Sequence, residues 1–98
     1  MSQFVSSVRF QVKAGHRDEF VAKLKDFKLP TGALHHTVVE TGDHTMCTFV
    51  TWKEEQDLAN ARPEMISFLD SIRDLLEELS PELGVTDPVS GPVIHHDS

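Results

Sequence analysis

Cysteine is nearly absent from this chain, which has only Cys47 among its 98 residues. A single cysteine excludes an intrachain disulfide framework and is typical of proteins that fold in a reducing compartment. Cys47 falls in the middle of a strand-like run, where a free thiol is usually a small buried side chain and not a reactive group. We therefore expect a fold that is stabilised by packing alone.

Clustered basic residues and long apolar runs are also missing. Nine Lys and Arg against sixteen Asp and Glu give a formal net charge of −7. Nucleic acids and anionic membranes are bound through clustered Lys and Arg, so this balance disfavours both as partners. No apolar run approaches the ~20 residues that span a bilayer. The N-terminus also lacks the basic and apolar regions of a signal peptide, so we expect a cytoplasmic protein.

What the chain does have is a regular succession of strand-like and helix-like periodicities, in a length that suits one domain over residues 1–98. The predicted elements are a strand over 4–12, a helix from 16 to about 28, strands over 34–41 and 44–52, a short helix over 53–61, a longer helix from 63 to 79, and a strand over 89–95. The longer helix starts at Pro63, because proline suits a first helical turn and disfavours helical geometry in the residue before it. Prolines 88 and 92 place the last strand at a sheet edge.

The hairpin from Leu34 to Trp52 is the most informative segment. Gly42 and Asp43 predict a two-residue turn, which pairs Glu40 with Thr45. With that register, one face of the hairpin carries Leu34, His36, Val38, Glu40, Thr45, Cys47, Phe49 and Thr51. The other face carries His35, Thr37, Val39, Thr41, His44, Met46, Thr48, Val50 and Trp52. Neither face is purely polar, so we expect both to be covered.

The order strand, helix, strand, strand, helix, strand predicts a ferredoxin-like α+β sandwich with a βαββαβ topology. Its helices cover one face of an antiparallel sheet and leave the other face bare. A bare face with apolar side chains usually marks an interface. We therefore expect a homodimer that joins its subunits through their sheets, with the C-terminal strand reaching toward the partner.

The chain resembles the antibiotic biosynthesis monooxygenase family of the dimeric α/β-barrel superfamily. The resemblance rests on the first strand, the KAGHRDEF entry to the first helix, the Gly42-Asp43 hairpin, and a third strand that ends in Trp52 before an acidic segment. It implies a homodimer and a pocket between sheet and helices. Many members of the family oxidise an aromatic substrate there with O₂ and without flavin, metal or haem, so no cofactor is expected.

The resemblance also implies some site residues. Trp52 matches a tryptophan that can line the pocket, and Asn60 and Arg62 stand near positions where quinol-oxidising relatives use polar residues. Relatives that degrade haem have an asparagine on the first strand, where this chain has Ser6 and Ser7. This departure disfavours haem degradation.

The histidines suggest two kinds of chemistry. His35 and His36 are adjacent on a strand and point to opposite faces, and no three ligands share a spacing typical of zinc, so we expect no metal site. Either histidine could instead act as a base toward a phenol or hydroquinone, because its pKa lies near 7. Arg9 or Arg62 could stabilise the resulting anion. The alternative is that these histidines have structural roles at a strand pair or an interface.

Arg9 is expected on the sheet face without helices, where an interface would require a carboxylate partner. Glu40 of a second copy of the chain is the candidate. The sites predicted are therefore catalytic His35, His36 and Arg62, and substrate-binding Trp52, Asn60 and Arg9.

The functional hypothesis is a cofactor-independent monooxygenase-like protein that acts on a small aromatic or quinol compound. The main alternative is a non-catalytic homodimeric protein that binds a small ligand or serves in a stress response. A third reading is a structural dimer without an occupied pocket.

Overall fold

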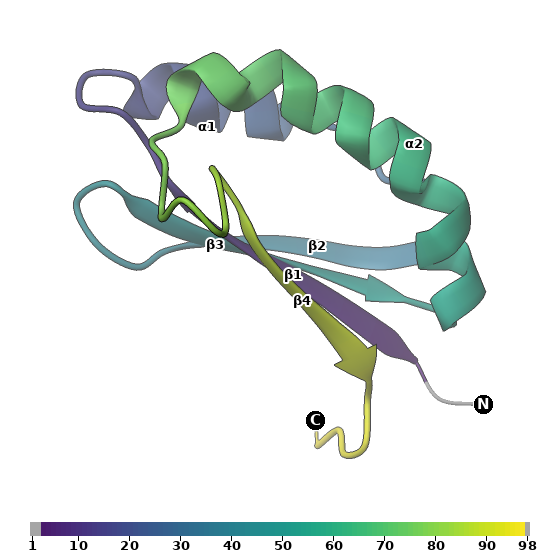
Figure 1. Ribbon diagram of the computed structural model, residues 1–98. Coiled ribbons are helices and arrows are strands. Elements are labelled where there is room, and N and C mark those ends of the chain that lie inside the picture. The colour runs from purple at the N-terminus through teal and green to yellow at the C-terminus, as the bar shows by residue number, and fades with distance from the viewer. Residues whose placement is uncertain (1–2, 98) are drawn as a thin grey trace.

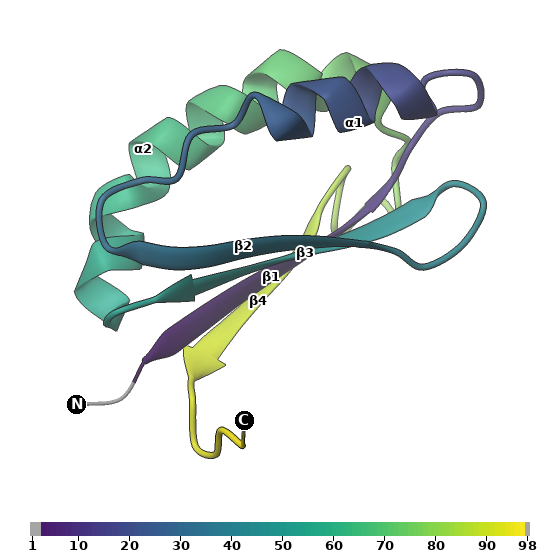
Figure 2. The same ribbon diagram turned by 180° about the vertical axis from the view of Figure 1, so that it is seen from behind.

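A computed structural model describes residues 3–97 of the chain. Its elements are β1 (Phe4–Gln11), α1 (Arg17–Lys25), β2 (Ala33–Glu40), β3 (Thr45–Trp52), α2 (Glu55–Ile72), a 3₁₀ turn (Arg73–Leu75) and β4 (Asp87–Pro92). Both helices lie on the same side of the sheet (Figures 1 and 2). Within residues 3–97, no helix combines the length and the apolar character that a membrane span requires.

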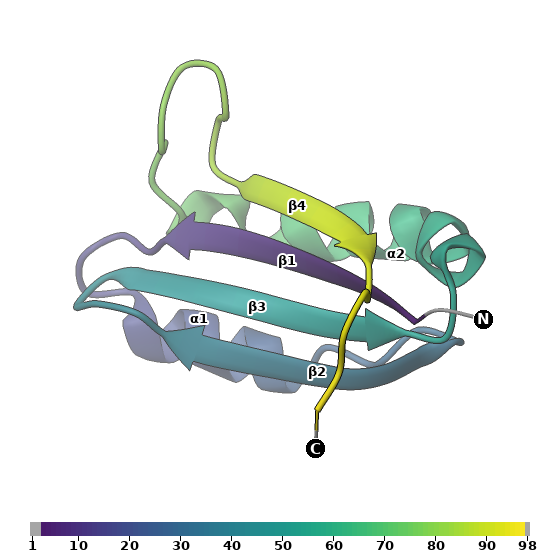
Figure 3. The ribbon, with the colours of Figure 1, turned by 90° about the horizontal axis from the view of Figure 1, so that it is seen from below.

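The strands form one four-stranded sheet in the order β2-β3-β1-β4, and each neighbouring pair is antiparallel. This arrangement confirms the predicted ferredoxin-like sandwich. We call the sheet face toward the helices the inner face and the opposite face the outer face. In the view from below, the outer face carries no helix, α1 lies behind β2 and β3, and α2 lies behind β1 and β4 (Figure 3).

The alternation expected for the first strand is confirmed in β1. Phe4 and Phe10 are buried on the inner face, while Arg9 is exposed on the outer one. In α1, Phe20 and Leu24 are the buried residues, one helical turn apart. The first turn is acidic and the last is basic, which suits the helix dipole.

The hairpin register was predicted wrongly. Glu40 pairs with Met46 instead of Thr45, and four residues, 41–44, connect the strands. A two-residue turn of the primed types needs positive φ values, and Gly42 does not have one. The loop is closed by the Thr41 amide, which donates to the Thr45 carbonyl at 2.9 Å.

This one-residue shift changes which residues share a face. His36, Val38 and Glu40 lie on the inner face together with Met46, Thr48, Val50 and Trp52. His35, Thr37 and Val39 lie on the outer face with Cys47, Phe49 and Thr51. The side chains of each strand alternate between the two faces as expected, but the prediction assigned the wrong residues of β2 and β3 to the same face.

The predicted break at Pro63 is also wrong, because α2 continues from Glu55 to Ile72 with Pro63 inside it. An internal proline removes a hydrogen bond and bends a helix, and the first turns of α2 curve toward the sheet in Figure 1. The helix persists because Leu58 and Ala61, before the proline, and Ile72, after it, are buried by the same sheet.

The helix also ends earlier than the expected residue 79. After Ile72, the backbone leaves the helix and pairs with the end of β1. The Lys13 amide donates to the Leu75 carbonyl at 2.8 Å, and the Glu77 amide donates to the Gln11 carbonyl at 2.8 Å. These bonds satisfy backbone groups that a longer helix would have used.

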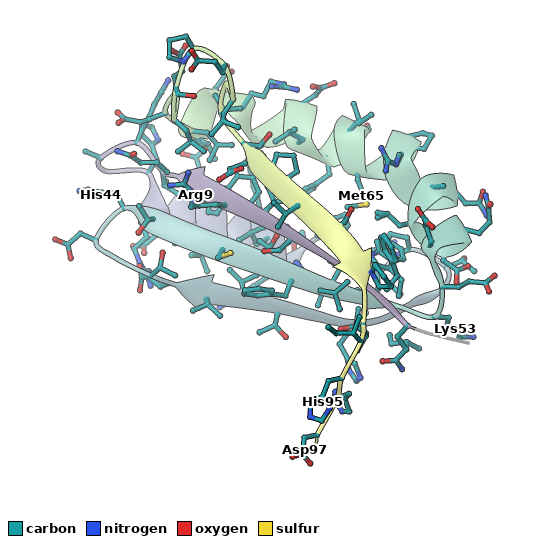
Figure 4. The ribbon with its side chains drawn as sticks, turned by 60° about the horizontal axis from the view of Figure 1, so that its bottom comes forward. Arg9, His44, Lys53, Met65, His95 and Asp97 are labelled. Carbon is teal, nitrogen blue, oxygen red and sulfur yellow. The ribbon has the colours of Figure 1, made fainter. Side chains whose placement is uncertain are left out.

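The last strand lies at a sheet edge, as predicted, but spans Asp87–Pro92 instead of 89–95. Pro92 faces Phe4, the first residue of β1, so residues 94 and 95 have no strand left to pair with. The tail beyond β4, with His95 and Asp97, extends away from the sheet (Figure 4).

Candidate functional site

A cavity of about 450 Å³ lies between the inner face of the sheet and the two helices. This volume is within the range of about 300–1,000 Å³ that is usual for small-molecule sites. Its floor comes from all four strands, and its roof comes from α2, Leu24 of α1 and Phe27 beyond it. Apolar side chains predominate among its walls, and no Asp, Glu or Lys is among them.

The cavity follows from side-chain size along the strands. The cross-strand rows of the inner face are, in order, Glu40, Met46 and Phe10; Val38, Thr48, Val8 and Pro88; His36, Val50, Ser6 and Ser90; and Ala33, Trp52, Phe4 and Pro92. The first and the last of these rows contain Phe, Met or Trp, and these large side chains belong to two separate core clusters. The two middle rows contain no Phe, Met or Trp and include Ser6, Thr48 and Ser90, so the space between the clusters stays hollow.

The cavity opens between α2 and β4. All of its exposed wall residues belong to these two elements: Arg62 and Ile66 on α2, and Pro88, Val89 and Ser90 on β4. Met65, which also lines the cavity, points from α2 toward β4 in Figure 4. The mouth is therefore at the edge of the sheet farthest from β2.

His36 is the histidine that lines the cavity. It projects from β2, and its ring packs edge-on against Phe27, with the ring centroids 5.4 Å apart. Burial in this apolar wall lowers the pKa of His36 below its usual 6.5, because a charged imidazolium would lose its hydration there. The ring is consequently neutral at pH 7 and able to accept a proton.

His36 also borders a second, smaller hollow, which lies between α1 and the edge strand β2. Arg17 and Glu40 both line that hollow, and Arg17 donates to Glu40 at 2.6 Å and 3.1 Å. The hydrogen bond from Arg17 lowers the pKa of Glu40, and the bond to Glu40 raises that of Arg17. Both groups are exposed, so this pair contributes little to stability.

Trp52 does not line the cavity, but it supports one of its walls. It is fully buried in the core cluster with Phe4 and Leu58. Its indole Nε1 donates to the Ser6 hydroxyl at 3.0 Å. Because Ser6 lines the cavity, this bond fixes the hydroxyl and satisfies a buried donor.

The other predicted site residues lie elsewhere. His35 and Arg9 are exposed on the outer face, as expected for neighbours of inward-facing residues, and Figure 4 shows Arg9 near the end of β1. Asn60 is exposed on α2, and its side chain accepts a hydrogen bond from Gln56 at 3.0 Å. Of the six predicted residues, the cavity brings together only His36 and Arg62.

Arg9 and Glu40, which we expected to pair across a dimer interface, each have a partner within the same chain. Arg9 donates to Asp87 on the neighbouring strand β4, at 2.9 Å and 3.2 Å. Glu40 lies on the opposite sheet face, because of the shifted hairpin register, and binds Arg17 instead.

Sequence reasoning missed Ser6, Thr48 and Phe27 as parts of the site. A usable signal was present for the first two: each is a small polar residue at an inward position between large apolar ones. Within residues 3–97, no cluster of three His, Cys, Asp or Glu side chains has the arrangement of a metal site.

The sequence matches no protein-family model and no curated protein. Solved structures match the fold over nearly the whole chain. A proposed antibiotic biosynthesis monooxygenase from Chloroflexus aurantiacus is 13% identical with a TM-score of 0.75, and the match covers 99% of this chain and 98% of that one. A variant of SnoaB, a cofactor-independent oxygenase from Streptomyces nogalater, is 14% identical with a TM-score of 0.70 and coverages of 98% and 97%.

A third structure is a dimeric ferredoxin-like protein from an uncultured marine organism, which is 9% identical with a TM-score of 0.74 and coverages of 100% and 93%. Similarity at these identities establishes the fold. It agrees with the resemblance to antibiotic biosynthesis monooxygenases, and it assigns neither a reaction nor a substrate.

Proposed function

We propose that this protein is a cofactor-independent monooxygenase that oxidises a small aromatic or quinol compound in the cavity under α2. The observation that carries the proposal is a half-buried histidine in the wall of an apolar cavity that has no acidic side chain. The solved structures of oxygenases with this fold add support.

In the proposed reaction, His36 removes the proton from a phenolic hydroxyl of the substrate. The phenolate transfers one electron to O₂, and the resulting radical and superoxide combine to form a new C–O bond. The peroxide anion takes the proton back from His36 and becomes a hydroperoxide. Loss of water from the hydroperoxide leaves a quinone, so one oxygen atom enters the product and the other leaves as water. The apolar walls exclude solvent, which destabilises the phenolate and favours electron transfer.

Arg62 is the only charged residue among the described residues of the cavity wall and attracts anionic forms of the substrate. Trp52 acts indirectly by fixing the Ser6 hydroxyl. Arg9, His35 and Asn60 take no part in the proposed reaction, because they lie outside the cavity.

Oxygen consumption tests this proposal. We expect the protein to consume O₂ above the buffer rate with at least one member of a panel of hydroquinones and naphthohydroquinones. His36→Gln should reduce the rate by about 10²-fold or more, as expected for loss of a general base. The matched control is His35→Gln, which changes the same residue type on the outer face and should keep the rate. Equal loss in both variants, or no uptake with any compound, would remove the catalytic proposal.

The alternative is a ligand-binding protein without catalysis, and one observation favours it. No side chain among residues 3–97 hydrogen-bonds the His36 ring, whereas catalytic histidines are usually oriented by a partner. Binding of the same quinols without oxygen uptake would support this reading.

We also propose that the protein is a homodimer joined through the outer face. Apolar side chains on that face remain accessible, including Phe49 at 40%, Val39 at 41% and Val89 at 63%. The charges of Arg9 and Asp87 neutralise each other there, so a second copy could pack against the face. The tail beyond β4 extends away from the sheet, where it could reach a partner.

Sedimentation tests the dimer. The wild-type protein should sediment as twice 11.0 kDa, and Phe49→Glu should produce the monomer. Leu83→Glu is the control, because Leu83 is 42% exposed but lies in the loop before β4. A wild-type monomer at micromolar concentration would contradict the proposal.

A further inference from the structure

Among the residues that the structure describes, Arg62 differs from the other arginines because no carboxylate there pairs with it. Arg9 contacts Asp87 at 2.9 Å, Arg17 contacts Glu40 at 2.6 Å, and Arg73 contacts Asp70 at 2.9 Å. Within residues 3–97, no carboxylate lies within 4.0 Å of Arg62.

The sequence around Arg62 explains why it stays unpaired. Side chains three and four residues apart are neighbours on a helix. For Arg62, these positions hold Leu58, Ala59, Met65 and Ile66, none of which is acidic.

The position of Arg62 suggests what it binds. It lies at the mouth of the cavity, next to Ile66 and opposite the edge strand β4. The walls behind it carry no other charge at pH 7, because His36 is neutral and no Asp, Glu or Lys is among them. A ligand that enters therefore finds one cation at the entrance and an apolar interior.

We infer that the cavity binds an amphipathic monoanion, with its carboxylate on Arg62 at the mouth and its aromatic body inside. This inference depends on the proposal that the cavity is the binding site, and it does not depend on catalysis. The planar guanidinium donates two parallel hydrogen bonds to a carboxylate, which makes arginine well suited to this group.

The dimensions of the sheet limit the ligand. Adjacent strands are about 4.8 Å apart, so the row from Ser90 on β4 to His36 on β2 spans roughly 14 Å. A body of fused rings can extend along this row, with a phenolic hydroxyl near His36 and the carboxylate at the other end. The proposed substrate class is thus a hydroxyaryl carboxylate, and Arg62 holds a charge that is present throughout the reaction.

Calorimetric titration without oxygen tests the inference. The probes are a hydroxynaphthoate and the neutral hydroxynaphthamide of the same shape. We expect the wild-type protein to bind the carboxylate about fivefold to tenfold more tightly than the amide, as a charged hydrogen-bond pair at a partly hydrated mouth predicts. Added salt should weaken only the carboxylate.

Matched variants locate the effect. Arg62→Gln should abolish the preference for the carboxylate and leave the affinity for the amide within about twofold of the wild-type value. Arg62→Lys should retain most of the preference for the carboxylate. Arg73→Gln removes the same charge from a position outside the cavity and should change neither affinity. An equal affinity of wild type for both probes, no binding of either probe, or an undiminished preference in Arg62→Gln would overturn the inference.

Oxygen uptake separates this inference from the proposed reaction. A carboxylate that binds through Arg62, together with no oxygen uptake for any compound of the panel, supports the inference and removes the catalytic proposal. Oxidation of neutral naphthols that bind as tightly as the carboxylate supports catalysis and overturns the inference.

Discussion

The ends and the middle of the inner sheet face are built on the same strands but packed in opposite ways. At the ends, Phe10 and Met46 on one side and Phe4 and Trp52 on the other fill the space beneath the helices. In the middle, the positions between them hold small side chains such as Ser6 and Thr48, and a cavity remains. The filled ends stabilise the fold, and the hollow middle is available for a ligand.

Removing bulk from a filled end should have the largest effect. Trp52 is fully buried, so Trp52→Ala should lower the free energy of unfolding by about 3–5 kcal/mol. Urea unfolding followed by circular dichroism measures this change without the tryptophan signal. A loss below about 1 kcal/mol would mean that this end of the core is not tightly packed.

Removing the Ser6 hydroxyl should have the next largest effect. Ser6→Ala leaves the buried Trp52 Nε1 without its acceptor, which should lower the free energy of unfolding by about 1–2 kcal/mol. Ser90→Ala is the control at an exposed position of β4 and should change stability by less than about 0.5 kcal/mol. Similar effects of both changes would contradict the role assigned to the buried bond.

Adding bulk to the hollow middle should be tolerated. A larger residue in a packed core costs about 1–3 kcal/mol, but Thr48→Phe can extend into the cavity and should cost less than about 1 kcal/mol. The same change should prevent quinol binding, as measured by calorimetry. A well-folded Thr48→Phe protein that still binds the ligand would show that the ligand binds elsewhere.

The smallest expected effect is a pH dependence from His36. Because its pKa in the folded protein is lower than in the unfolded chain, unfolding takes up protons below about pH 6.5. Stability should thus be complete above that pH and fall as the pH drops through the lowered pKa. A titration of the ring protons by NMR should give a pKa below 6.5 for His36, and His36→Gln should reduce the pH dependence of urea unfolding. A pKa above 6.5 would contradict the apolar setting.

Much of the fold follows from local patterns. The spacing of apolar residues predicts the alternation of β1 and the βαββαβ order, and the prolines predict the edge position of β4. The hairpin register does not follow from local patterns. It depends on the backbone conformation of Gly42, and glycine can adopt several conformations. The continuity of α2 through Pro63 depends on burial of both halves of the helix by the sheet, which overrides the local preference.

The site was predictable only in part. His36 and Arg62 were identified from their chemistry, but His35 could not be separated from His36 without knowing which hairpin face the helices cover. The cavity itself depends on how far side chains from the helices reach over Ser6 and Thr48. That distance is a property of tertiary packing and not of any single segment.

Mapping a bound ligand by NMR tests most directly whether the hollow middle is the functional site. A naphthohydroquinone added without oxygen should shift the Trp52 indole N–H, the His36 ring and the amides of Ser6 and Thr48, and it should leave His35 and Phe49 unchanged. Shifts confined to His35, Phe49 and the rest of the outer face, or no shifts at saturating ligand, would contradict this account.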